Sequence, residues 1–146
     1  MRKVFLDASV LIAGSASSTG ASRAVLLLAE VGLFQAIVSE QVLEECRRNL
    51  IKKLPDAIPT YEEILFKLNL IVLSNPIPAE CARWQRIIEP KDTPILAAAV
   101  LHKVDRLLTL NTRDFTQEVS IQTKLTIQTP ADFIQETRKI LEEGMK

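Results

Sequence analysis

The feature that most constrains the fold is a short apolar run near the start of the chain, Val4-Phe5-Leu6, which ends on Asp7. A short, continuous apolar run bounded by polar residues is typical of a buried strand inside a parallel sheet. Ligands of open α/β sheets bind in the crevice beyond the carboxyl ends of the strands, so Asp7 is a candidate site residue. Alternatively, Asp7 only caps the turn after the strand by accepting hydrogen bonds from nearby backbone N–H groups.

The rest of the chain alternates between strand and helix patterns. The expected strands cover residues 4–6, 34–38, 70–73, 105–110 and 124–128. The expected helices are one capped by Ser22 and ended by Gly32, followed by 40–54, 61–68, 79–88, 95–102 and 131–143. Residues 14–20 are small and polar and indicate a flexible loop. This alternation predicts an α/β fold in which helices cover a central, mainly parallel sheet of four to five strands.

Composition limits the classes of protein to consider. A chain of 146 residues can bury a full core as a single domain over residues 1–146, without a disulfide or structural metal. It is 47% hydrophobic and 25% charged, and it contains neither a membrane-length apolar run nor a signal-peptide pattern. We therefore expect a cytoplasmic protein that does not enter a membrane. Cys46 and Cys81 lack metal-binding spacing, and we expect both to be reduced and buried.

Basic residues are balanced by acidic ones, at 18 of each. They nevertheless gather in three stretches, which are Arg47, Arg48, Lys52 and Lys53; Arg83, Arg86 and Lys91; and His102, Lys103, Arg106 and Arg113. Such clusters either contact phosphates or form solvated faces. We expect the nearby aromatic residues Trp84 and Tyr61 to pack in the core, and His102 to be an exposed helix residue.

Oxygen-bearing side chains recur where a parallel sheet would bring them together. These residues are Asp7, Glu44 or Glu45, Asp92, Asn111 and Asp114. Carboxylates that share a cleft repel one another unless protons or cations neutralise them, and Mg²⁺ or Mn²⁺ prefers such oxygen ligands. Because His102 is the only histidine, a Ser-His-Asp triad would have to use it, and a metal-dependent reaction fits better. Phosphodiester hydrolysis is the reaction that one or two such cations support best.

Four segments resemble the PIN domain family, which is named for the PilT amino terminus. They are 5–11 (FLDASVL), 39–45 (SEQVLEE), 91–99 (KDTPILAAA) and 107–115 (LLTLNTRDF). The resemblance covers nearly the whole chain in the same order. It implies a three-layer α/β/α fold and an acidic Mg²⁺ or Mn²⁺ site that cuts RNA. Many relatives are VapC-like ribonuclease toxins of toxin-antitoxin pairs, often homodimeric, whose antitoxin protein blocks the site.

By that resemblance, Asp7 matches the first acid of the family, Glu45 the second and Asp92 the third. Glu44 is adjacent to Glu45, and only one of the two can face the site easily because neighbouring helix positions differ by about 100°. Asn111 stands where an aspartate is common. It offers a carbonyl oxygen but no charge, so Asp114, directly or through water, and the hydroxyl of Thr109 are expected to complete the ligand set.

Other readings of these residues remain open. Asp92 and Asp114 could cap a helix and a turn, Glu45 could be a surface acid, Ser9 could bond only the loop backbone, and Arg113 could only pair with an acid. A PIN-like module, catalytically weak or inactive, that binds nucleic acid or a partner protein without cutting is a second hypothesis, motivated by Asn111 and zero net charge. A phosphate-accepting receiver or phosphatase ranks below both, because the chain lacks the Asp-x-Asp pair of such a phosphatase.

Overall fold

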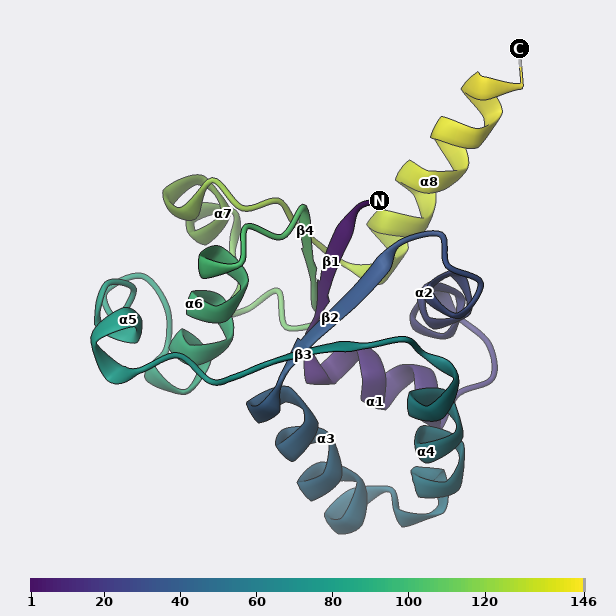
Figure 1. Cartoon of the computed structure of the whole chain (residues 1–146), viewed down its shortest axis with the longest axis horizontal. Helices are drawn as coiled ribbons and strands as arrows, with labels where there is room; N and C mark the ends of the chain where they lie inside the picture. The colour runs from purple at the N-terminus through teal and green to yellow at the C-terminus, as the bar shows by residue number, and fades with distance from the viewer. Residues whose placement is uncertain (146) are drawn as a thin grey trace.

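The computed structural model describes residues 1–145, so Lys146, the last residue of the expected single domain, lies outside the described part. Its centre is a five-stranded sheet in the order β3-β2-β1-β4-β5 (Figure 1). The strands are β1 (Lys3–Leu6), β2 (Gln35–Ser39), β3 (Ile71–Leu73), β4 (Arg106–Leu108) and β5 (Ile127–Gln128). Every neighbouring pair is parallel. The predicted parallel α/β sheet is therefore confirmed.

Helices cover both faces of the sheet, as Figure 1 shows. The α-helices are α1 (Ala8–Ala16), α2 (Ala21–Glu30), α3 (Glu40–Lys53), α4 (Ile58–Lys67), α5 (Pro78–Ala82), α6 (Thr93–Leu101), α7 (Gln117–Thr123) and α8 (Pro130–Gly144), with short 3₁₀ turns η1 (Pro55–Ala57) and η2 (Pro90–Asp92). Helices α5, α6 and α7 lie on one side of the sheet, and α1, α2 and α4 lie on the other. The fold is thus a three-layer α/β/α arrangement, as expected.

Strand β1 and helices α1 and α6 contribute fully buried residues to the core. Val4, Phe5 and Leu6 are fully buried, and so is the alanine run 97–99 of α6, whose small side chains let the helix approach the sheet. Gly14 of α1 lies so close to Leu26 of α2 that a Cβ atom there would overlap the leucine side chain. These contacts fix α1, and with it the residue that precedes it, Asp7.

Four local predictions were wrong. Residues 8–16 form the helix α1, although we expected an apolar continuation and then a loop from residue 14. This helix is buried on several sides and therefore lacks the one-sided apolar pattern that identifies surface helices. Helix α2 begins after Gly20, whose φ of +94° suits glycine, so Ser22 lies inside the helix rather than at its cap. Helix α7 was not predicted, and α5 ends at Ala82, earlier than expected.

Several smaller expectations agree with the structure. Tyr61 and Trp84 are buried, His102 is exposed, and Cys46 and Cys81 are buried free thiols. Within residues 1–145, no single helix has the length and apolar character needed to cross a membrane; only the bent pair of α1 and α2 passes by length and composition.

Candidate functional site

The candidate acids lie around the carboxyl ends of the central strands. Asp7 directly follows β1 and caps α1, while Ser39 ends β2 and caps α3, the helix that carries Glu45. Thr109 directly follows β4. Because β2, β1 and β4 are parallel neighbours, these three positions meet at one edge of the sheet.

Asp7 is held rigidly. Its side chain is 7% exposed, and it accepts hydrogen bonds from Ala8 N (2.9 Å), Thr109 Oγ1 (2.7 Å) and Ser9 Oγ (3.2 Å). Burial raises the pKa of Asp7, and the three donors lower it in part. The backbone bond is the cap that the simpler interpretation expected. The hydroxyl bond from Thr109 goes beyond capping, because it joins the Asp7 carboxylate to the residue that follows β4.

Asp92 is also buried, but it lacks hydrogen-bond donors like those that hold Asp7. It occupies the cap position of α6, but its side chain makes no capping hydrogen bond, and its Oδ2 is buried without a partner among the described residues. Burial, followed by the neighbouring Asp114, raises the pKa of Asp92 to about 7. A buried carboxylate oxygen without a donor is costly unless a proton or a cation occupies it. The geometry therefore does not support the interpretation that Asp92 only caps its helix.

Of the two adjacent glutamates, Glu45 faces the site. Its carboxylate accepts a hydrogen bond from Gln41 Nε2 (3.1 Å), and burial together with the charge of Asp7 raises its pKa. Glu44 also lines the cavity on this side of the acids, but its side chain is 70% exposed and pairs with Arg48 at 3.5 Å. Glu45 is therefore the less exposed of the two and the one whose pKa is raised by the charge of Asp7.

Asn111 and Asp114 form the outer part of the site. Asn111 Nδ2 donates to Asp114 Oδ2 (3.1 Å), and Asp114 N donates to Asn111 Oδ1 (3.3 Å). Asn111 N also donates to Thr109 Oγ1 (2.9 Å), the hydroxyl that binds Asp7. The hydrogen bond from Asn111 is the largest of the effects that lower the pKa of Asp114. The outer pair is therefore linked to Asp7 through one hydroxyl group.

The carboxylates of the site shift one another's pKa values by charge repulsion. The charge of Asp7 raises the pKa of both Glu45 and Asp92, and Asp114 raises that of Asp92. In residues 1–145, however, no group of three or more Asp, Glu, His or Cys side chains stands close enough together to hold a metal ion as arranged. The residues supply the oxygen chemistry that Mg²⁺ and Mn²⁺ require, and the unpartnered Asp92 oxygen fits a cation ligand.

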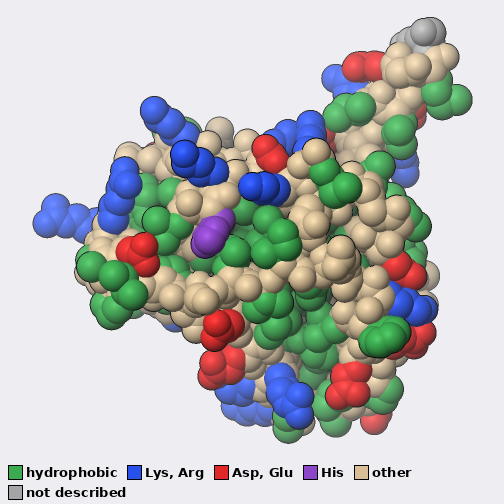
Figure 2. Space-filling model, in the orientation of Figure 1, with side chains coloured by type: hydrophobic (Ala, Val, Ile, Leu, Met, Phe, Trp, Pro, Cys, Tyr) green, Lys and Arg blue, Asp and Glu red, His purple; other side chains and the backbone are tan. Residues whose placement is uncertain are grey.

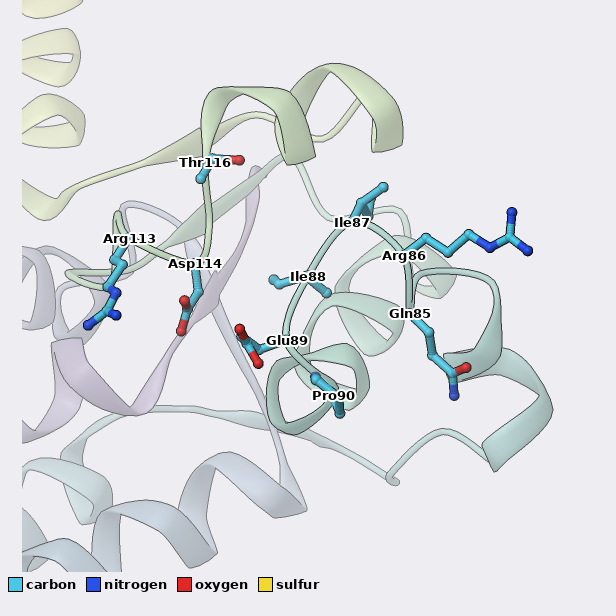
Figure 3. Close-up of a pocket in the computed structure, with 9 residues that line it drawn as sticks. All are labelled: Gln85, Arg86, Ile87, Ile88, Glu89, Pro90, Arg113, Asp114 and Thr116. Atoms are coloured by element: carbon cyan, nitrogen blue, oxygen red, sulfur yellow. The ribbon is translucent and has the colours of Figure 1, made fainter.

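Two open cavities adjoin the acids. The first, of about 390 Å³, is lined by residues 85–90 together with Arg113, Asp114 and Thr116. Figure 3 shows Asp114 and Glu89 pointing toward one another there, while Arg86 extends away. The second, of about 330 Å³, lies on the Glu45 side and includes Gln41, Arg48 and Lys91. Sequence analysis missed Glu89 and Gln41, although Glu89 could have been found as the acid that immediately precedes the Pro90-Lys91-Asp92 turn.

The basic residues divide between the site and the general surface. Arg113 and Arg48 line the two cavities, and Lys91 Nζ lies 3.9 Å from Asp114 Oδ2. Arg106, in contrast, pairs with Glu136, and Arg83 stacks over the Trp84 ring. Figure 2 shows several Lys and Arg side chains gathered over the upper left of the visible face, and others mixed with acids in its lower part. Only the residues near the acids can therefore contact a substrate bound there.

The chain is similar to one protein family profile and to several solved structures. Residues 3–113 match the family profile described as "PIN domain". No curated protein sequence matches the chain. Among solved structures, similarity is found to VapBC2 from Rickettsia felis bound to a promoter DNA fragment, with 15% identity, a TM-score of 0.62 and coverage of 87% of this chain and 98% of the other.

Two further solved structures are similar to the same extent. PAE2754 from Pyrobaculum aerophilum has 18% identity and a TM-score of 0.63, covering 92% of this chain and 88% of the other. VapBC-1 from nontypeable Haemophilus influenzae has 16% identity and a TM-score of 0.61, covering 88% of this chain and 98% of the other. At such identities the likeness establishes the shared fold.

Proposed function

Because the chain belongs to the PIN domain family, we propose that it is a Mg²⁺- or Mn²⁺-dependent endoribonuclease that hydrolyses RNA phosphodiester bonds. One observation carries the proposal. A buried carboxylate oxygen, Asp92 Oδ2, has no hydrogen-bond partner among residues 1–145, and the pKa of Asp92 is raised by burial and by the neighbouring Asp114 and Asp7. Such a group is unfavourable in a merely structural role and suitable as a cation ligand.

The proposed ligands are Asp7, Glu45 and Asp92, with Asn111 and Asp114 completing the set. A bound divalent cation would supply charge neutralisation for the scissile phosphate and a water of lowered pKa. The chain itself contributes positioning. Thr109 and Ser9 hold the carboxylate of Asp7, and Gln41 orients Glu45 while it also donates to Lys91 O at 3.2 Å.

RNA would lie across the two cavities on either side of the acids. Arg113 on one side, and Arg48 and Lys91 on the other, would pair with backbone phosphates. Because the chain has no net charge, the attraction must come from these local side chains. We expect RNA binding to weaken steeply with added salt.

The biological role proposed is that of a toxin in a toxin-antitoxin pair. Two of the similar structures are described as VapBC proteins, which supports an antitoxin protein as partner. A cytoplasmic location and a homodimeric state belong to the same proposal.

Cleavage of single-stranded RNA with Mn²⁺, against an EDTA control, tests the proposal. We expect Asp7→Asn and Glu45→Gln each to lower the cleavage rate by about 100-fold or more, because each removes a ligand charge. Glu62→Gln is the matched control, since it removes the same charge from an exposed position of α4. Wild-type rates in both site variants would contradict the assignment.

A non-cutting RNA- or partner-binding module is the second candidate. Asn111 favours it, because this side chain is committed to Asp114 and adds no charge to the site. Calorimetric titration with Mn²⁺ separates the two. The nuclease proposal requires saturable binding that Asp92→Asn removes, whereas RNA binding without Mn²⁺ binding or cleavage would favour the module.

A further inference from the structure

A third cavity adjoins the acidic site, and the proposed function does not use it. It has a volume of about 400 Å³ and is lined by residues of β5, of the loop after β4, and of the first turns of α7 and α8. Most of its lining side chains carry a hydroxyl or an amide, among them Thr112, Thr116 and Gln117. Within residues 1–145, Asp132 is the only charged residue that lines it.

The loop between β4 and α7 separates this cavity from the acids. Asp114 lines the cavity on the acidic side, Thr112 lines the third cavity, and Thr116, which leads into α7 in Figure 3, lines both. At the start of the loop, Thr109 lines the third cavity and donates to Asp7 Oδ2 at 2.7 Å. A ligand whose charged part lies at the acids can therefore place a neighbouring part in the third cavity.

Three polar side chains at the third cavity are available to a ligand. Thr112 and Gln117 are exposed, and neither side chain forms a hydrogen bond within residues 1–145. The carboxylate of Asp132 is also exposed and accepts one bond, from Thr129 N at 3.4 Å. Ser120, in contrast, donates to the backbone at Leu125 O. The available groups thus supply donors, acceptors and one negative charge.

This chemistry suits a nucleobase better than a phosphate. In the described part of the chain no Lys or Arg lines the third cavity, and the charge of Asp132 repels an anion. A carboxylate accepts hydrogen bonds from the exocyclic amino group of cytosine or adenine, whereas uracil presents a carbonyl oxygen at that position. The Thr112 hydroxyl and the Gln117 amide can donate to the acceptors of the same base.

We propose that the third cavity is a base subsite for single-stranded RNA, which takes a base with an exocyclic amino group in preference to uracil. Asp132 accepts from the amino group, while Thr112 and Gln117 contact the ring acceptors. Phosphate contacts position a strand without reading its sequence, so this subsite supplies the sequence preference. The inference rests on the proposed function, because it assumes that RNA phosphates lie at the acids.

Fluorescence anisotropy with labelled oligo(C) and oligo(U) of equal length, in EDTA, tests the subsite without cleavage. The two oligomers carry the same phosphates, so the ratio of their dissociation constants reports the base. We expect the whole chain to bind oligo(C) about tenfold more tightly than oligo(U), because only cytosine offers an amino group to Asp132. Asp132→Asn should reduce this preference to about twofold or less, since an amide can also donate to uracil.

Two further variants complete the test. Asp56→Asn is the matched control, because it removes the same charge from an exposed position of η1, and it should retain the preference. Thr112→Val removes a hydroxyl at an exposed loop position and should weaken oligo(C) binding a few-fold. Circular dichroism verifies that each variant is folded.

The outcomes separate this inference from the nuclease proposal. Equal binding of the two oligomers by the wild type, or a preference that survives Asp132→Asn, would overturn the subsite even if Mn²⁺-dependent cleavage is observed. If Asp132→Asn does not fold, unchanged oligo(C) binding by Thr112→Val overturns the subsite instead. A preference that depends on Asp132, in a protein that does not cleave RNA with Mn²⁺, would support the subsite and contradict the nuclease proposal alone.

Discussion

Two acids at opposite ends of the central sheet have opposite environments. Glu136 of α8 accepts from Arg2 (2.7 Å), Arg106 (2.8 Å) and Gln128 (2.7 Å), and these donors lower its pKa to about 2. Asp92 is buried at the other end, one of its oxygens has no hydrogen-bond partner in the described part of the chain, and its pKa is raised to about 7. The first acid is fully satisfied by the fold, and the second is not.

This difference separates a stabilising role from a functional one. A carboxylate surrounded by fixed hydrogen-bond donors stabilises the fold, and its oxygens are already occupied and not available to a ligand. A buried carboxylate with an unused oxygen weakens the metal-free fold and retains affinity for a cation. The comparison therefore predicts that substitutions at the two positions change the stability of the metal-free protein in opposite directions, and that only the substitution at Asp92 lowers activity.

The largest effect is expected on RNA cleavage. Asp92→Asn should lower the Mn²⁺-dependent rate by about 100-fold or more, because the amide provides no charge to a cation. Glu136→Gln should leave that rate unchanged, since the arginines that it releases are at the other end of the sheet. Rates measured with saturating Mn²⁺ at one temperature, where both variants are folded, compare the two. Equal losses of cleavage rate in both variants would contradict the assignment of a functional role to Asp92 and a stabilising role to Glu136.

The second effect concerns metal and stability together. At a Mn²⁺ concentration 100 times the dissociation constant, binding to the folded state should stabilise the wild type by about 2.7 kcal/mol. The melting temperature of Asp92→Asn should not respond to Mn²⁺, whereas that of Glu136→Gln should rise like the wild type. Thermal unfolding with EDTA and then with Mn²⁺ measures both. If Mn²⁺ does not raise the melting temperature of the wild type, Asp92 is not a cation ligand.

The third effect is a pair of opposite pH dependences. The folded pKa of Glu136 is below the ordinary value of 4.5, so its stabilisation is present above pH 4.5 and disappears as the pH falls toward 2. The folded pKa of Asp92 is above the ordinary 3.8, so the metal-free protein should lose stability as the pH rises from about 4 to 7.

Urea unfolding across this pH range, in EDTA, checks both signs. Glu136→Gln should cost about 1–2 kcal/mol at pH 7 and almost nothing near pH 2, given that the side chain remains 27% exposed and its ion pairs are partly screened. Asp92→Asn should be more stable than the wild type at pH 7 and equal to it near pH 4. An Asp92→Asn variant that is destabilised at pH 7 would show that Asp92 supports the fold after all.

The sequence was sufficient to predict the sheet and the positions of the acids along the chain. Strand runs such as 4–6 and the Pro94 helix start are local signals, and the parallel order follows from their alternation with helices. Helix α1 was missed, because burial on several sides removes the periodicity that identifies a helix. The choice between Glu44 and Glu45, and the absence of a partner for Asp92, depend on contacts between distant segments, which a sequence pattern does not contain.

The smallest effect is expected at Asn111, where the comparison can be sharpened. Asn111 donates to Asp114 Oδ2 and accepts from Asp114 N, so the amide is satisfied as Glu136 is, although it belongs to the acidic end. Asn111→Asp would replace the donating amide by a charge and make the outer pair resemble Asp92. We expect Mn²⁺ to bind a few-fold more tightly and the metal-free protein to lose about 0.5–1 kcal/mol, because two carboxylates would then face each other.

Calorimetry with Mn²⁺ and urea unfolding in EDTA measure the two changes in the same variant. If cation affinity depends on carboxylate oxygens that lack hydrogen-bond donors, and not only on the number of acids, tighter Mn²⁺ binding and lower metal-free stability must occur together in this variant. Tighter binding without loss of metal-free stability would show that added charge alone is sufficient. Lower stability without tighter binding would mean that Asn111 serves only to hold the turn that carries Asp114, and that Asn111 is not a ligand of the cation.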